Sequence, residues 1–220
     1  MNRVDSTQAN EDRMLRLILL ALTVSFFGTP AASGSNSALL GRSIEEARSS
    51  QFFQFFNLTK TNEMADPAHP GLKLTVFGVQ GRFKGNVNLL VSTKEGSDEI
   101  IDVALMLRRD FVDGPTSPFA RDVAKSFLEI YPDPNFPEIA TLRSDIWKGC
   151  SQNVQQYTNN GQGSFVRSPC SVEDKPSPSY LTFLGKLEKS RIDSSNGHVM
   201  LQNTDKILGV PVLLIDMGRP

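Results

Sequence analysis

Three alternating apolar segments followed by one amphipathic helix, within residues 72–131, constrain the fold of this chain more than any other feature. Apolar side chains recur at every second position over 72–76, 87–91 and 101–107. This period is typical of β-strands. A two-residue turn at Gln80-Gly81 would place Leu74 opposite Val87 and bring two apolar faces together. The pattern therefore predicts an antiparallel meander.

The segment after the third strand predicts a helix that covers this sheet. Pro118 fits a first helical turn, where a missing N–H does no harm, and Pro132 ends the helix. The apolar residues between them lie within one narrow arc: Phe119, Val123, Phe127 and Ile130. The sequence thus predicts an α+β fold, in which two or three amphipathic helices pack on an antiparallel meander sheet.

Residues 1–34 have the layout of a secretory signal peptide. Arg13 and Arg16 accompany an apolar run of thirteen residues, 15–27, which is followed by small residues. A membrane-spanning helix needs about 20 apolar residues, so the run is short for a span. We expect cleavage near 31–34 and export to the periplasm or the extracellular space, with the short leader favouring a bacterial source. An uncleaved anchor and a start at Met14 are the alternatives.

The two cysteines predict one disulfide in an exported chain. Cys150 and Cys170 would close a short loop and stabilise the fold by ~3 kcal/mol if the bond is unstrained. Two free buried thiols are the alternative. A redox pair is disfavoured because the Cys-x-x-Cys spacing is absent.

Residues 35–60 predict a linker followed by a phenylalanine-rich helix. Ser43 and Glu46 form a capping-box pattern at its start. Four phenylalanines occupy five positions near its end: Phe52, Phe53, Phe55 and Phe56. Such a cluster indicates either a helix packed on the domain or an interaction surface for a partner or a membrane. The next residues, Asn57-Leu58-Thr59, match a glycosylation sequon.

The second face of the meander mixes apolar and polar side chains. Phe77, Leu90 and Met106 fall on it beside Asn88 and Asp102. Such a face is neither a continuous core nor a fully solvated surface, so these three apolar residues join the candidate interaction surface. Either the phenylalanine-rich helix or an external ligand would cover it.

The remainder of the chain, within a single domain over 66–220, alternates between helix and strand signals. Apolar spacing predicts one helix from Ile139 to the stop at 159–161, and Asn196-Gly197 predicts a hairpin. The alternating residues at 181–187 indicate a strand. Val210 to Ile215 predicts a last strand, and Pro211 favours an edge position for it.

Catalytic signatures are sparse. With two histidines in the chain, no tight cluster of metal ligands and no glycine-rich phosphate loop, the sequence predicts no metal and no cofactor. His198 beside a turn, and Asp102 if another carboxylate meets it in space, are the candidate catalytic residues. The charge balance of 23 basic to 24 acidic residues disfavours nucleic acid as a partner.

These features predict an exported, non-catalytic binding or scaffolding domain whose partner is a protein or an apolar small molecule. An exported hydrolase that uses His198 or paired carboxylates around Asp102 is the first alternative. A membrane-surface or assembly protein that uses the segment from Phe52 to Phe56 is the second.

Overall fold

The fold is described from a computed structural model. It covers residues 38–66, 69–114, 117–159, 176–205 and 209–219, with backbone alone for 149–159. All of these lie in the second of two units, residues 35–220. The predicted leader, Cys170 and the side chain of Cys150 lie outside the described part, so cleavage and the disulfide stay predictions.

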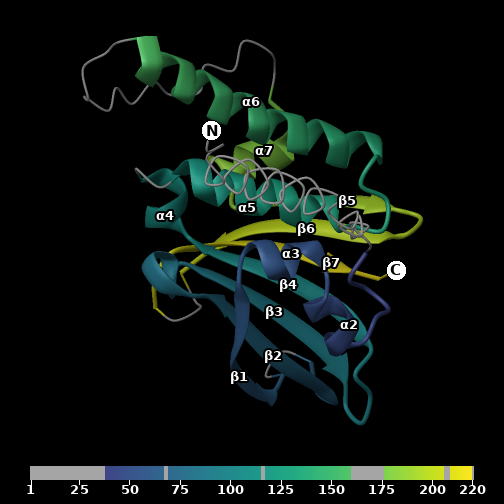
Figure 1. The fold of residues 1–220 in the computed structure, drawn as a ribbon. Helices are drawn as coiled ribbons and strands as arrows, with labels where there is room; N and C mark the ends of the chain where they lie inside the picture. Colours follow the sequence, from purple (N-terminus) through teal and green to yellow (C-terminus); the bar gives the residue numbers. More distant parts are fainter. Residues whose placement is uncertain (1–37, 67–68, 115–116, 160–175, 206–208, 220) are drawn as a thin grey trace, which may run out of the picture. The chain divides into compact units, whose positions relative to one another are not determined.

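The described chain forms one seven-stranded antiparallel sheet (Figure 1). The strands are β1 (Leu58–Ala65), β2 (Leu72–Val79), β3 (Val87–Lys94), β4 (Ile100–Arg108), β5 (Lys189–Ser194), β6 (Gly197–Thr204) and β7 (Val212–Gly218). Their order across the sheet is β1-β2-β3-β4-β7-β6-β5. The predicted meander is therefore β2-β3-β4, and the last strand β7 joins it to the β5-β6 hairpin.

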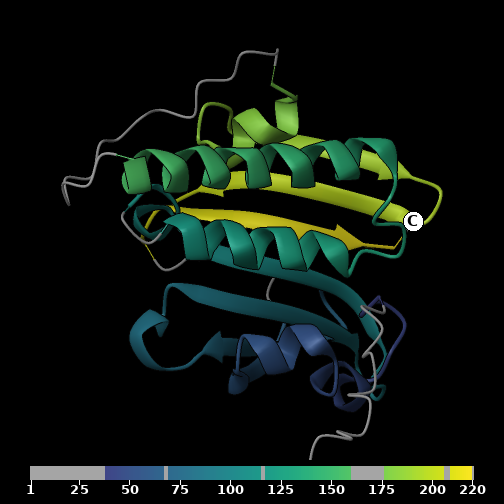
Figure 2. The ribbon, with the colours of Figure 1, turned by 45° about the horizontal axis from the view of Figure 1, so that its top comes forward.

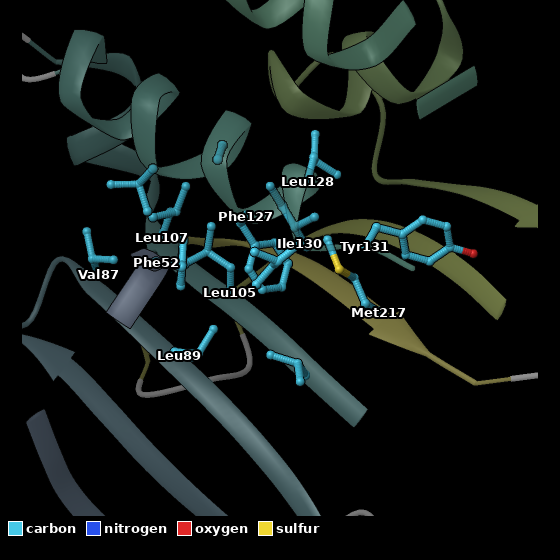
Figure 3. Close-up of a cluster of buried hydrophobic side chains, with 14 of the residues drawn as sticks. Phe52, Val87, Leu89, Leu105, Leu107, Phe127, Leu128, Ile130, Tyr131 and Met217 are labelled. Atoms are coloured by element: carbon cyan, nitrogen blue, oxygen red, sulfur yellow. The ribbon is translucent and has the colours of Figure 1, made fainter. Parts of the chain in front are cut away.

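Helices gather on one face of this sheet, which confirms the predicted α+β class. They are α2 (Ile44–Arg48), α3 (Gln51–Phe55), α4 (Arg109–Asp113), α5 (Ser117–Glu129), α6 (Pro137–Asn159) and α7 (Pro178–Phe183). Figure 2 shows α3 in blue, α5 in teal and α6 in green on the same side of the strands. The core lies between these helices and the sheet. Figure 3 shows part of it, where Phe52 from α3 and Phe127 from α5 pack near Leu105 of β4.

The connection between β2 and β3 differs from the predicted two-residue turn. Residues 80–86 connect the strands, with a short 3₁₀ helix at Gly81–Phe83. Leu74 consequently pairs with Ser92, five residues beyond the predicted partner Val87. An odd shift exchanges the two faces of a strand. Leu74 therefore lies on the uncovered face, whereas Phe77 is buried in the core.

The phenylalanine-rich segment forms two short helices where the sequence predicted one. The predicted capping box at Ser43 and Glu46 is present and begins α2. A second cap, Ser50, accepts a hydrogen bond from the Phe53 N–H and begins α3. Three of the four rings are buried in the core, and only Phe55 is exposed, at 72%.

Two predictions for the C-terminal part were wrong. The segment 181–187 contributes to helix α7 because Ser177 caps it and Pro178 fits its first turn. The last strand β7 lies inside the sheet, between β4 and β6, and not at an edge. Pro211 immediately precedes β7, so its missing N–H removes no hydrogen bond from the sheet. The predicted hairpin at Asn196-Gly197 is confirmed.

Candidate functional site

The second face of the sheet is not covered by any helix or strand of the described ranges (Figure 2). Strand pairing arranges its side chains in rows, because directly paired residues share a face. The first row is Leu74, Ser92, Asp102, Gly218 and His198, and the second is Val76, Leu90, Ala104, Asp216 and Met200. The third is Gly78, Asn88, Met106, Leu214 and Gln202. The face is therefore mostly apolar in the middle, with one carboxylate in the first row, Asp102, and one in the second, Asp216.

We define the carboxylate cluster as Asp66, Ser92, Asp102, His198 and Asp216. Ser92 and Asp102 are direct cross-strand neighbours on β3 and β4. Asp216 of β7 lies one row away, diagonal to both Asp102 and His198, since these two residues each pair with Gly218. Diagonal side chains on neighbouring strands can contact each other. Four neighbouring strands, β3, β4, β7 and β6, thus each contribute one of these side chains to a single patch of the sheet.

Hydrogen bonds extend the cluster beyond the strands. The Ser92 hydroxyl donates to Asp66 Oδ2 at 3.1 Å, and His69 Nδ1 lies 3.2 Å from the same oxygen. Asp66 is buried although it follows the edge strand β1. At the other end, His198 Nε2 lies 3.5 Å from Asp216 Oδ2. A carboxylate–histidine contact therefore flanks each side of Asp102.

Gly218 provides the space in which this arrangement fits. A Cβ atom at position 218 would lie 2.4 Å from His198 Cε1 and 3.1 Å from Asp102 Oδ2. Both side chains therefore lean across the glycine toward each other. Any larger residue at this position would have to displace the imidazole ring.

The electrostatics of the cluster favour a proton held between two carboxyl groups. Burial, together with the negative charges of Asp216 and Asp66 and a hydrogen bond to Asp216, raises the pKa of Asp102 to about 8. Two adjacent carboxylates cannot both ionise without strong repulsion. At neutral pH Asp102 is consequently a hydrogen-bond donor, and Asp216 accepts from it. Such a pair can bind a polar group or take part in acid–base chemistry.

The structure brings the two sequence-predicted catalytic candidates close together through a residue that sequence reasoning missed. Asp102 and His198 each neighbour Asp216, which lies in an otherwise apolar stretch of β7. An aspartate isolated among apolar residues at the end of a predicted strand was the sequence feature that could have identified Asp216 as a site residue. Of the other predicted interaction residues, Leu90 is half-buried on the uncovered face, Met106 lies on the same face but is only 5% exposed, and Phe77 lies in the core.

A cavity of about 360 Å³ lies elsewhere, around the end of β6 remote from His198. Its lining residues are Arg109, Glu188, Gln202, Asn203, Thr204, Asp205, Pro211 and Val212. The Arg109 guanidinium donates to the Phe183 carbonyl at 2.8 Å and also pairs with Asp113. The Asn203 amide donates to two further carbonyls, those of Thr182 and Leu187. These contacts tie α4 and β6 to α7, which gives Arg109 and Asn203 a structural role.

Within the described ranges, no group of three or more histidine, cysteine or acidic side chains is arranged to hold a metal ion. Nor does any helix there combine the length and apolar character needed to cross a membrane. Comparisons of the chain with protein-family models, curated proteins and solved structures found no match.

Proposed function

We propose that this chain is an exported, non-catalytic binding domain whose ligand surface is the uncovered face of the sheet. The observation that carries the proposal is the apolar middle of that face. Its side chains are only partly buried: Leu74, Val76, Leu90, Ala104, Met200 and Leu214. A contiguous apolar patch on a domain surface usually marks a site of interaction. The ligand is an apolar or amphiphilic small molecule.

The carboxylate cluster fits the polar end of such a ligand. The Asp102–Asp216 pair, which shares one proton, and Asp66 offer carboxyl oxygens that accept hydrogen bonds at the border of the apolar rows. A few polar groups beside an apolar surface fix the orientation of a bound molecule. Anionic ligands are disfavoured here because three carboxyl groups lie close together.

Export and disulfide formation complete the proposal. The signal-peptide layout of residues 1–34 supports cleavage near 31–34. An oxidising compartment would then join Cys150 to Cys170. The disulfide would attach the polar segment after α6 to that helix.

Binding of a neutral apolar dye tests the ligand surface. The chain should bind N-phenyl-1-naphthylamine with increased dye fluorescence, and Leu90→Gln should weaken binding about tenfold, because a lost apolar contact of ~1.4 kcal/mol changes affinity by that factor. Leu187→Gln is the matched control, since Leu187 is 40% exposed and precedes β5 outside the face. Equal affinity of the two variants would contradict the proposal, as would absence of dye binding.

A hydrolase is the second candidate, and the proximity of Asp102, Asp216 and His198 favours it. Protonated Asp102 would act as the general acid, Asp216 as the base, and His198 would orient Asp216. A panel of chromogenic esters and glycosides tests this role. Asp102→Asn should abolish any turnover that the natural chain shows, and unchanged turnover would rule out the pair. The membrane-surface alternative is disfavoured, because Phe55 is the one exposed ring among the four of the phenylalanine-rich segment.

A further inference from the structure

Phe55 is the exception in the phenylalanine-rich segment. Its side chain is 72% exposed at the end of α3, while Phe52, Phe53 and Phe56 are at most 4% exposed. Within the described ranges, its ring contact is an edge contact to Phe56, at 4.9 Å between centroids. An aromatic ring left in water forgoes ~1.5–3 kcal/mol of burial free energy. A group that covered this ring would therefore stabilise the protein, and the described residues leave most of the ring uncovered.

Burial alternates along the turn from α3 into β1. Phe56 and Leu58 are buried at 3% and 8%, whereas Phe55, Asn57 and Thr59 are exposed. The ring, the amide and the hydroxyl thus lie on the solvent side of the same short turn. These are the three groups of the pattern Phe-x-Asn-x-Thr.

The backbone of the turn presents the amide outward. Asn57 has a φ of +47° and is the one non-glycine residue with positive φ in the described ranges. Its backbone N–H donates to the Gln54 carbonyl at 3.2 Å, which ends the helix, and β1 begins at the next residue. Asparagine tolerates this left-handed conformation well. The turn explains an asparagine here, but it does not explain the exposed ring at 55. The Thr59 hydroxyl accepts a hydrogen bond from the Gln80 side-chain amide in the folded chain.

We propose that Asn57 is an N-glycan acceptor whose first sugar packs on the Phe55 ring. The Asn57 Nδ2 atom would bond to the anomeric carbon of a lipid-diphosphate-linked oligosaccharide. The bond from that carbon to the diphosphate oxygen breaks, the amide loses one proton, and the lipid diphosphate leaves. Thr59 supplies the hydroxyl that the transferase requires two residues after the acceptor.

The contact with Phe55 follows from the shape of a sugar. The C–H face of a pyranose is apolar and covers an aromatic ring in the same way as an aliphatic side chain. A glycan on Asn57 would therefore bury part of the ring that is now in water. The proposal rests on the proposed export, and not on the ligand surface, and it requires a source whose export route carries this sugar donor.

Secretion of the full chain from a eukaryotic cell tests the proposal. With a strong secretory leader placed ahead of residue 1, the product should carry a glycan mass that peptide N-glycosidase removes, converting Asn57 to Asp. Thr59→Ala should lose this mass and Thr59→Ser should keep it, and neither change alters the acceptor. A secreted chain of unmodified mass would overturn the proposal, as would a glycan that persists in Thr59→Ala.

Two further experiments test the sugar–Phe55 contact and the export of the chain separately from attachment of the glycan to Asn57. Enzymatic removal of the glycan should lower the Tm of the natural chain by more than that of Phe55→Ala, and equal losses would overturn the contact with the ring. The chain with its own leader alone is secreted in parallel. Its retention in the cell would contradict export while leaving the glycan result from the first arm intact.

Discussion

Replacing Asp102 with asparagine should remove the fall in stability that this residue causes between about pH 4 and pH 8. The pKa of Asp102 rises from 3.8 to about 8 in the folded chain, because of burial and the neighbouring Asp216. Between these two values the folded state binds the proton more tightly than the unfolded state does. The free energy of unfolding of the natural chain therefore falls as pH rises through this window. Asparagine has no proton to lose, so the variant lacks this decline.

The size of the effect follows from the shift. About 4 pH units at ~1.4 kcal/mol each set an upper bound of about 6 kcal/mol. Water reaches the pair, since the Asp216 side chain is 17% exposed, and it screens the repulsion. We expect ~2–3 kcal/mol after this reduction.

Urea unfolding at about pH 5, 7 and 9 measures the difference. Near pH 5 the two proteins should differ least, because the folded chain still holds the Asp102 proton and the decline that begins near pH 4 is small there. Near pH 9 Asp102→Asn should be the more stable by the stated amount. Asp98→Asn, at a carboxylate that is 75% exposed, is the control and should follow the natural chain. Parallel stability curves for Asp102→Asn and the natural chain would refute the shared-proton account.

Two other predictions follow from the structure, and a third follows from the sequence. Gly218→Ala should displace the His198 ring, 2.4 Å from the new methyl position, and cost ~1–3 kcal/mol in urea unfolding; an unmoved imidazole NMR signal would contradict this. Phe53→Ala should cost ~3–5 kcal/mol, since the ring is 3% exposed, and an unchanged urea midpoint would remove it from the core. Alkylation of the native, exported chain should label neither Cys150 nor Cys170 until a reductant is added, and immediate labelling of both would disprove the disulfide.

Local signals in the sequence predicted the elements that depend on local physics. Helix α5 has an apolar arc and a proline at its start, and the hairpin before β6 has Asn196-Gly197, so each could be read from neighbouring residues. The sequence did not predict strand β1, because seven of its eight side chains are exposed and show no alternation of apolar and polar residues. The register of β2 against β3 depends on the length of the connection over 80–86, which apolar spacing alone does not determine.

The candidate site was predictable only in part. Asp102 stands out as a charged residue within the apolar strand β4, so a carboxylate partner for it could be anticipated. The identity of that partner depends on β7 lying next to β4. Pro211 predicted an edge strand instead. The pairing of β7 with both β4 and β6 joins segments that are far apart in the sequence, and it depends on the burial of both strands in the folded chain.

The interior position of β7 sets the order in which the sheet can assemble. The strands β1 to β4 and the β5-β6 hairpin touch through β7, the last strand along the chain. During synthesis from the N-terminus, neither half can complete its hydrogen bonding until residues 212–218 are available. A truncation that removes Val212–Gly218 would therefore divide one continuous sheet into two smaller ones, each with a new unpaired edge and a tendency to aggregate.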